Sequence, residues 1–207
     1  MQQGRIYSRG EHIFDQSTPF RACFAVRSGA VKTSIVAEDG EEQVTGFFLP
    51  GEIVGLDSMS CEQYACTASA LERTSICEFP VHKLEELTVK LPELQQHMYQ
   101  LMGQEIRASH QMAMLLSKNT AEERIAALLM SLSSRFQRRR LSGTRFHLPM
   151  ARNDIANFLG LAVETVSRVF TRFQNQGLIR AKGRDIELLN VEALQGVARE
   201  LSNQNCS

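Results

Sequence analysis

The sequence lacks any apolar run of about 18 residues or more, so no transmembrane helix and no membrane partner are expected. Its first residues, MQQGRIYSRGEH, also lack the apolar core of a secretory signal peptide. At 207 residues and 43% hydrophobic composition, the chain can form one large or two modest domains with a sizeable core. These features predict a cytoplasmic protein.

Cysteine is scarce, and no two cysteines form a CxxC pair. Their number is odd, and without an export signal a disulfide framework is not expected. Buried structural thiols are the favoured interpretation, although Cys61 and Cys66, close in sequence to Cys77, leave open an unrelated metal or redox site. The five cysteines are Cys23, Cys61, Cys66, Cys77 and Cys206.

The net charge of the whole chain is zero, but the charges are unevenly distributed along it. Residues 1–117 hold 9 Lys and Arg against 15 Asp and Glu, a net charge of −6. Residues 118–207 hold 14 against 8, a net charge of +6. A basic half in a neutral protein favours a polyanion partner for that half alone. A pair of complementary solvated surfaces is the alternative.

Residues 92–118 are almost free of helix breakers, since Pro92 is their only proline and Gly103 their only glycine. A helix here is about 40 Å long, more than a small domain usually needs. It carries two apolar stripes with coiled-coil spacing, and one can pack on the chain's own domains. The second stripe needs another surface, which predicts a dimer with another copy of the helix. A core helix buried on both faces is the alternative. The first stripe is Leu94, Met98, Leu101, Glu105, Ala108, Met112 and Leu115, and the second is Tyr99, Met102, Ile106, Ser109, Ala113 and Leu116.

Residues 1–80 contain short β-rich segments separated by Gly and Pro, which predicts a small antiparallel barrel or roll. The Asp39-Gly40 dipeptide between two of them is typical of a hairpin. An enzyme of cupin type would need clustered His and carboxylate ligands, but residues 1–90 contain only His12 and His82, which are far apart in sequence. The expected strands span residues 5–7, 12–14, 23–27, 31–36, 43–49, 53–56 and 75–79.

Three further helices are predicted besides the longest one and the helix-turn-helix described below. A short helix over residues 81–91 precedes it. Thr120 and Glu123 form a capping-box pattern that predicts a helix over 121–138. Residues after Asn190 are interpreted as a final helix and a frayed tail.

Residues 152–179 fit a helix-turn-helix. Ile155 and Leu159 lie one turn apart and can face a core, while Ala156 is small where a second helix must cross closely. Gly160 falls at the turn, where a positive φ is useful. The expected buried face of the second helix is Val163, Val166, Val169 and Phe170.

The opposite face of that second helix is polar, with Glu164, Ser167, Arg168 and Thr171 spaced three, four and seven residues apart. An α-helix fits the major groove of DNA, where Arg can donate two hydrogen bonds to guanine and Glu can accept one from cytosine. A solvated face with an internal Glu164–Arg168 pair is the alternative. It does not explain the small, glycine and apolar positions around this face. We therefore predict base reading by Glu164, Ser167 and Arg168.

A β-hairpin wing is predicted from two short strands around Gly183 and Arg184. Its basic side chains are placed to meet DNA phosphates, which fix position without reading sequence. The expected phosphate contacts are Arg180, Lys182 and Arg184 in the wing and Thr171 on the second helix.

In combination these segments resemble the CRP/FNR family of bacterial transcription regulators, most of all its FNR-type (Anr-like) oxygen-responsive branch. The similarity covers essentially the whole chain. It implies an α+β fold with a β-roll sensor domain over 1–90, a dimerisation helix over 91–118 and a winged helix-turn-helix over 119–207. The matching stretches are FAVRSGAVK at 24–32, GEEQVTGF at 40–47, TSICEFP at 74–80, LLSK at 115–118, AEERI at 121–125 and ETVSR at 164–168.

The resemblance implies a homodimer that reads an inverted repeat similar to TTGAT…ATCAA in double-stranded DNA, one half-site per subunit. The family's base-reading trio falls on Glu164, Ser167 and Arg168. No enzymatic activity is implied. Activation of an anaerobic or redox-type regulon through contact with RNA polymerase is implied instead. The polymerase-contacting loop falls on the hairpin tip, at Gly40, Glu41 and Glu42.

Cyclic-nucleotide binding is not expected. Members similar to CRP bind cyclic AMP through an Arg followed by a small hydroxyl residue, and the corresponding place here is about Tyr64-Ala65. No arginine lies between Lys32 and Arg73 to neutralise a buried phosphate.

FNR-type sensors hold a [4Fe–4S] cluster with three cysteines in an N-terminal extension and one in the roll. Cys77 matches the roll cysteine, but this sequence lacks the extension, and Cys23, Cys61 and Cys66 do not match the ligand positions. The chain as given is therefore expected to hold no cofactor. The alternative is the DNA-binding core of an oxygen sensor whose longer natural form holds the cluster.

Ser109 stands where FNR-type sensors commonly carry an aspartate. Two facing carboxylates oppose dimerisation unless a cluster compensates. The serine predicts dimerisation without a cluster, through Tyr99, Met102, Ile106, Ala113 and Leu116.

Overall fold

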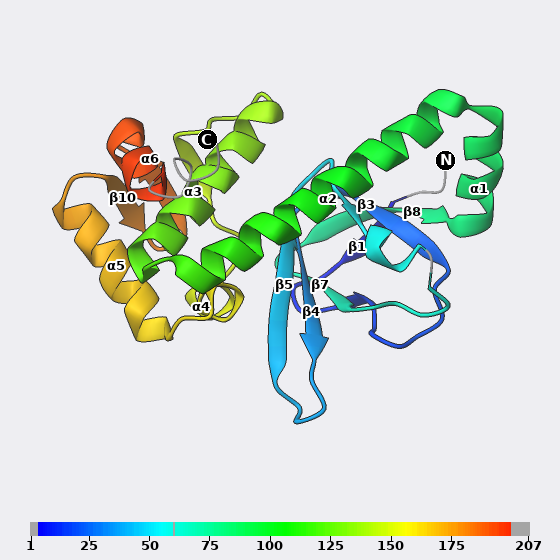
Figure 1. The fold of residues 1–207 in the computed structure, drawn as a ribbon, viewed down its shortest axis with the longest axis horizontal. Helices are drawn as coiled ribbons and strands as arrows, with labels where there is room; N and C mark the ends of the chain where they lie inside the picture. Colours follow the sequence, from blue (N-terminus) through cyan, green and yellow to red (C-terminus); the bar gives the residue numbers. More distant parts are fainter. Residues whose placement is uncertain (1–3, 60, 200–207) are drawn as a thin grey trace. The chain divides into compact units, whose positions relative to one another are not determined.

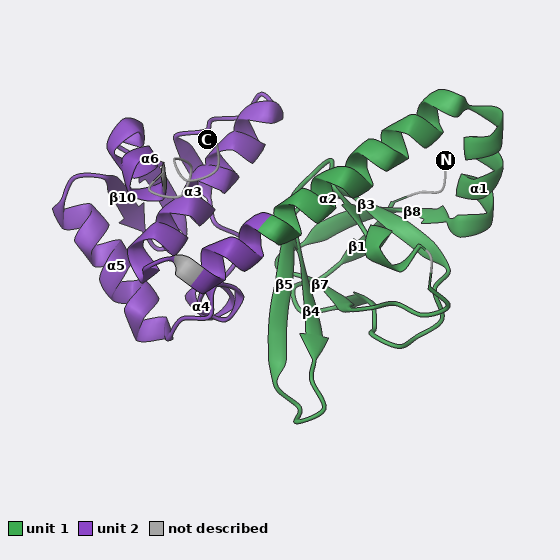
Figure 2. Cartoon of the chain, viewed as in Figure 1, with its two compact units in different colours: residues 1–110 green, residues 111–207 purple. Residues whose placement is uncertain are grey.

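A computed structural model describes residues 4–59 and 61–199 (Figure 1). The chain divides into two compact units, residues 1–110 and 111–207 (Figure 2). The predicted frayed tail and Cys206 lie outside the described residues. Within those residues, no helix is both long and apolar enough to cross a membrane.

The first unit is a β-roll of two four-stranded antiparallel sheets, with strand orders β1-β8-β3-β6 and β2-β7-β4-β5. Its core draws buried apolar residues from both sheets, so the core lies between them. The predicted Asp39-Gly40 hairpin is confirmed, because the two strands on either side of it pair antiparallel and Gly40 has a φ of 85°. The strands are β1 (Arg5–Tyr7), β2 (His12–Phe14), β3 (Ala22–Ser28), β4 (Val31–Val36), β5 (Glu42–Phe48), β6 (Ile53–Val54), β7 (Thr67–Ala70) and β8 (Thr74–Pro80).

Two details of the predicted strands were wrong. The strand expected over 53–56 ends at Val54, because Gly55 has a φ of 89° and a 3-10 turn, η1 (Leu56–Ser58), follows it. Strand β7 was not predicted, since its sequence TASA has no large apolar residue to mark it. It nonetheless lies inside its sheet, paired with both β2 and β4.

Two helices complete the first unit and lead out of it. Helix α1 (Val81–Lys90) packs on β8 and ends before Pro92. Helix α2 (Pro92–Lys118) has the bounds that the sequence predicted. Its first apolar stripe is anchored by Met98 and Leu115, which are both buried.

The second unit consists of helices packed with a three-stranded sheet of order β10-β11-β9. The capping box at the start of α3 is confirmed: Thr120 Oγ1 accepts the Glu123 N–H at 3.3 Å, and the Glu123 carboxylate accepts the Thr120 N–H at 2.8 Å. Strand β9 was not predicted, because it is three residues long and only Phe146 in it is buried. The elements are α3 (Ala121–Arg138), β9 (Arg145–His147), α4 (Arg152–Leu159), α5 (Val163–Asn175), β10 (Ile179–Lys182), β11 (Asp185–Leu188) and α6 (Val191–Arg199).

Candidate nucleic-acid interface

Helices α4 and α5 form the predicted helix-turn-helix. Ile155, Ala156 and Leu159 are buried, as the spacing predicted. Gly160 has a left-handed backbone conformation, with φ 61° and ψ 43°, and it caps the C-terminus of α4. The chain then turns at once, because the Leu161 N–H bonds back to the Ala156 carbonyl at 2.9 Å. This turn fixes where α5 begins.

Helix α5 has one apolar and one polar face. Val166, Val169 and Phe170 are buried as predicted, whereas Val163 is only half-buried. Phe173, which the sequence interpretation omitted, is fully buried and extends the apolar face by a turn. The polar face is exposed along its length, at Glu164, Ser167, Arg168 and Thr171.

The polar face is held by bonds along the helix itself. Arg168 Nε donates to the backbone carbonyl of Glu164 at 3.3 Å, and Thr171 Oγ1 donates to the Ser167 carbonyl at 3.0 Å. Arg168 therefore contacts the backbone of Glu164 and not its carboxylate. Both charged groups are exposed on one side of a helix that can enter a major groove.

Arg152 supports this helix from the start of α4, a role that the sequence interpretation missed. Its guanidinium lies over the Phe170 ring, 3.5 Å from the ring centroid. Burial lowers the pKa of Arg152 from its ordinary value. Arginine next to a buried aromatic is a favourable cation–π contact, and here it joins the first helix to the second. The sequence gives no sign of this contact, because positions 152 and 170 are far apart along the chain.

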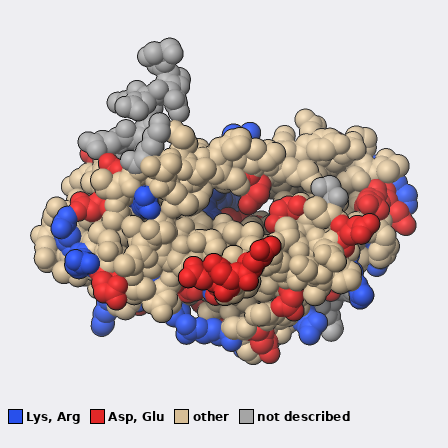
Figure 3. All heavy atoms as spheres, turned by 60° about the horizontal axis from the view of Figure 1, so that its bottom comes forward, with Lys and Arg blue, Asp and Glu red and all other residues tan. Residues whose placement is uncertain are grey.

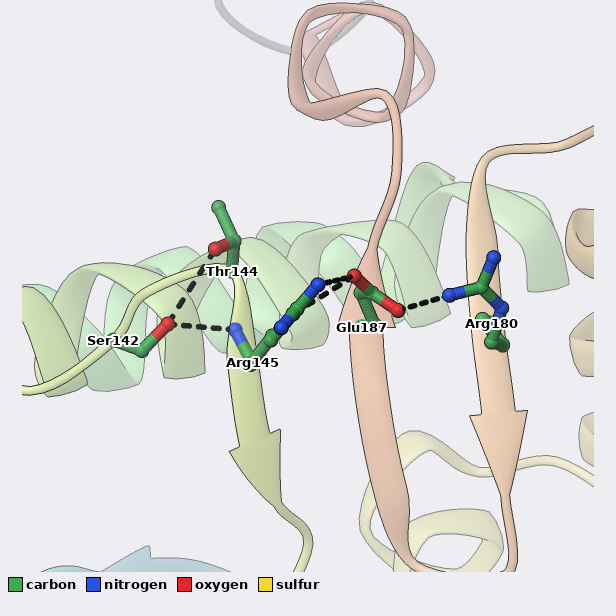
Figure 4. Close-up of polar contacts among 5 residues, drawn as sticks. All are labelled: Ser142, Thr144, Arg145, Arg180 and Glu187. Atoms are coloured by element: carbon green, nitrogen blue, oxygen red, sulfur yellow. Dashed lines mark hydrogen bonds and ion pairs between the residues drawn. The ribbon is translucent and has the colours of Figure 1, made fainter.

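The wing carries two cross-strand rows of charge on one face of its sheet. In the first row, the Glu187 carboxylate lies between two arginines (Figure 4). Arg145 Nε donates to Glu187 Oε1 at 2.8 Å, and Arg180 pairs with Glu187 Oε2. The hydrogen bond from Arg145, with the charges of both arginines, lowers the pKa of Glu187. Arg180 is thus exposed but already paired with a carboxylate.

The second row lies two residues along each strand. Lys182 is opposite Asp185, and Asp185 Oδ1 is 2.8 Å from His147 Nδ1. Lys182 is exposed, as a phosphate contact requires. Arg184 is different, because it is half-buried and donates to the Pro149 carbonyl at 3.0 Å. Arg180 and Lys182 are therefore more exposed to a DNA phosphate than Arg184 is.

Tyr64 lies at about the place where the family resemblance puts the nucleotide-binding arginine, and the roll also contains two buried cysteines. The Tyr64 ring stacks on Phe14 at 4.0 Å between centroids, and its hydroxyl donates to the Ala22 carbonyl at 2.9 Å. Burial raises the pKa of the Cys23 and Cys66 thiols to about 12, so both thiols stay protonated at neutral pH.

A [4Fe–4S] cluster does not fit the thiols that the structure describes. Cys77 is half-buried and Cys61 is exposed, so the expectation of a buried thiol was wrong for Cys61. Among residues 4–59 and 61–199, no three His, Cys, Asp or Glu side chains gather into a metal-binding group. Four thiolates are the usual requirement for such a cluster.

The hairpin tip is exposed and acidic. The backbone N–H of Glu41 donates a hydrogen bond to Asp39 Oδ1 at 3.0 Å, and this bond stabilises the turn at Gly40. Glu42 is the first residue of β5 and pairs with Lys32 at 3.0 Å, so only part of its carboxylate surface is open. Figure 3 shows a continuous group of acidic side chains on the face that it views.

The second stripe of α2 is exposed in the single chain. Tyr99 is 65% and Ile106 57% exposed, which are large values for such side chains. Ser109 and Ala113 are exposed as well, while Met102 and Leu116 are half-buried.

Comparisons with known proteins agree with this architecture. Residues 5–90 match the cyclic nucleotide-binding domain family, and residues 123–197 match the Crp-like helix-turn-helix domain family. The chain is 52% identical over 198 residues to the transcriptional activator protein FnrA of Stutzerimonas stutzeri, covering 96% of this chain and 81% of that protein. The chain belongs to the CRP/FNR family of transcription regulators.

Two further proteins extend the comparison. The transcriptional activator protein Anr of Pseudomonas aeruginosa is 53% identical over 190 residues, covering 92% of this chain and 78% of that protein. The structure of FixK2 from Bradyrhizobium japonicum matches with a TM-score of 0.86 and 29% identity, over 94% of this chain and 96% of that one. The predicted family, fold and class of DNA-binding regulator are confirmed, and the relatives are regulators and not enzymes.

Proposed function

We propose that this regulator is a cytoplasmic homodimer that activates genes by binding an inverted repeat similar to TTGAT…ATCAA. The observation that carries the proposal is the exposed face of α5 at Glu164, Ser167 and Arg168. The apolar face of α5 and the Gly160 turn hold this surface in place. Arg168 is assigned to a guanine, Glu164 to a cytosine amino group and Ser167 to a base or phosphate.

Phosphate contacts are proposed for the exposed Thr171, Arg180 and Lys182. Arg184 contributes mainly to the wing, because its guanidinium is bound to a backbone carbonyl. These contacts fix the position of α5 on the duplex and carry no sequence information.

The dimer is proposed to form along the second stripe of α2. An exposed row of apolar side chains is favourably buried against another copy of itself, and two-fold pairing places two recognition helices on two half-sites. Ser109 in that row adds no charge, so no cofactor is needed to offset a repulsion. The remaining members are Tyr99, Met102, Ile106, Ala113 and Leu116.

Activation is proposed to use the hairpin tip as the contact with RNA polymerase. Gly40 and Glu41 are exposed, and Glu42 is partly engaged by Lys32. Cyclic nucleotides are not part of this proposal, because Tyr64 is buried in the core against Phe14 and no arginine lies between Lys32 and Arg73.

A second candidate is the DNA-binding core of a [4Fe–4S] oxygen sensor. Its support is the half-buried Cys77 on β8, at the place of the family's roll ligand. Among the described residues no three potential metal ligands gather, so this candidate needs further cysteines from a longer form. Iron content and colour of anaerobically purified protein separate the two candidates.

Arg168→Ala tests the main proposal in a binding assay on a TTGAT…ATCAA duplex and on random DNA. The variant is expected to lose about 1–3 kcal/mol on the specific site and little on random DNA. Lys182→Ala is the matched control, because a phosphate contact should weaken both duplexes alike. Equal losses on both duplexes for Arg168→Ala would mean that Arg168 touches phosphate and reads no base.

A further inference from the structure

Arg124, in the first turns of α3, donates hydrogen bonds to three backbone carbonyls. Its Nε bonds the Asn119 oxygen at 3.0 Å, one terminal nitrogen bonds the Leu159 oxygen at 2.9 Å, and the other bonds the Leu116 oxygen at 2.7 Å. The three acceptors lie in the last turn of α2, in the α2–α3 connection and at the last residue of α4. One side chain of α3 therefore joins the ends of two other helices.

Both helix ends need such a donor. The Leu116 carbonyl cannot bond the N–H four residues later, because that Thr120 N–H is bonded to the Glu123 carboxylate. Leu159 ends α4, where carbonyls lack donors within the helix. A cation is also favoured at a helix C-terminus by the helix dipole. Arg124 satisfies both ends at once.

The guanidinium suits this position in a way that an ammonium does not. Its three nitrogens are held in one rigid plane, and here each bonds a different carbonyl. A lysine places all its donors on one nitrogen at the end of a flexible chain. Lysine at 124 would keep the charge but could not hold three separated acceptors in a fixed arrangement.

The Leu159 end is the turn of the helix-turn-helix. The next residue, Gly160, adopts its left-handed conformation directly beside Arg124, since a Cβ there would lie 3.7 Å from the terminal nitrogen. The turn determines where α5 starts. The other end, Leu116, belongs to the second stripe of α2. Arg124 thus connects the end of that stripe to the base of the recognition helix.

We propose that Arg124 is a positioning residue that holds the helix-turn-helix in a fixed register with the end of α2 and so sets the half-site spacing that the dimer accepts. The inference rests on the proposed dimer and its inverted repeat. One added base pair displaces a half-site by about 3.4 Å and rotates it by about 35°. A rigid connection rejects such a change, and a loose connection tolerates it.

The test is Arg124→Lys in the full chain, bound to duplexes whose spacer between the half-sites varies in single base-pair steps. The unaltered chain is expected to prefer one spacer over its neighbours by about tenfold or more, the scale on which a hydrogen bond to a charged group acts. Arg124→Lys is expected to reduce that preference to about threefold or less, because at least one of the three bonds is lost. Fluorescence anisotropy measures each affinity.

Arg138→Lys is the matched control, since Arg138 is an exposed arginine at the other end of α3. It should keep the original spacer preference. Affinity of Arg124→Lys for a duplex with a single half-site should be unchanged, because the base-reading face is intact. An unaltered spacer preference in Arg124→Lys overturns the proposal. Loss of single half-site affinity also overturns it, by assigning Arg124 to folding of the module.

Failure of the proposed function looks different. In that case the unaltered chain would bind the inverted repeat no better than a single half-site. The dimer, and with it the basis of this inference, would then be refuted before any variant is compared.

Discussion

Ser109→Asp is expected to separate the proposed dimer into monomers. Residue 109 is exposed on the same side of α2 as Ile106 and Ala113, and a two-fold axis through that stripe brings its two copies together. Two carboxylates about 6 Å apart, at an effective dielectric constant of about 20, repel by about 3 kcal/mol. Glu105, four residues earlier on the helix, adds about 0.2–0.5 kcal/mol of like-charge repulsion within each chain. The dimer dissociation constant should rise by about two orders of magnitude.

Sedimentation velocity at micromolar concentration checks this result, with iron-free protein prepared in air. The unaltered chain should be a dimer, and so should Ser109→Asn, whose side chain has the shape of aspartate without its charge. Ser109→Asp should be a monomer at neutral pH. Facing carboxylates raise each other's pKa in the dimer, so dimerisation of Ser109→Asp should be present at acidic pH and lost as pH rises. A monomeric unaltered chain, or an aspartate variant as tightly dimeric as the asparagine control, would refute the reasoning.

Three other changes test the wing, a helix cap and the buried thiols. Glu187→Gln frees two wing arginines, so affinity for any duplex should rise and its salt dependence should steepen by about one released ion per freed arginine; an unchanged salt slope contradicts this. Thr120→Ala should lower the free energy of unfolding in urea by about 1 kcal/mol, whereas Thr120→Ser should retain most of it. Alkylation of the native protein, read by mass spectrometry, should modify Cys61 and spare Cys23 and Cys66, whose pKa burial raises to about 12. Because the folded thiols hold their protons more tightly than unfolded ones, the free energy of unfolding should fall as pH rises above about 9. In the alkylation test, modification of Cys23 or Cys66 at neutral pH without unfolding would contradict their burial.

The helices could be predicted closely because their signals are local. Residues 92–118 combine apolar periodicity with a proline at the start, and the Thr120 and Glu123 pattern marks the start of α3. Gly160 marks the turn because few residues adopt its conformation. Each signal lies within a few residues of the feature that it predicts, so no tertiary contact was needed to interpret it.

Other features depend on register or tertiary contact and were missed for that reason. Strands β7 and β9 are short and owe their pairing to neighbours distant in sequence. Glu187 meets Arg145 only because β9 joins the wing as a third strand. Arg184, which stays a predicted phosphate contact, also donates to the Pro149 carbonyl, and a pattern of charges does not reveal that bond.

The boundary between the two compact units falls inside α2, between His110 and Gln111, where domains are more often joined by an exposed linker. The two units therefore share one helix, and the boundary itself is not a loop. Cutting the chain at the boundary would leave each half with a fragment of helix and an exposed apolar stripe. Exchange of modules between related regulators should therefore be designed at Asn119, where α2 has ended and α3 has not yet begun.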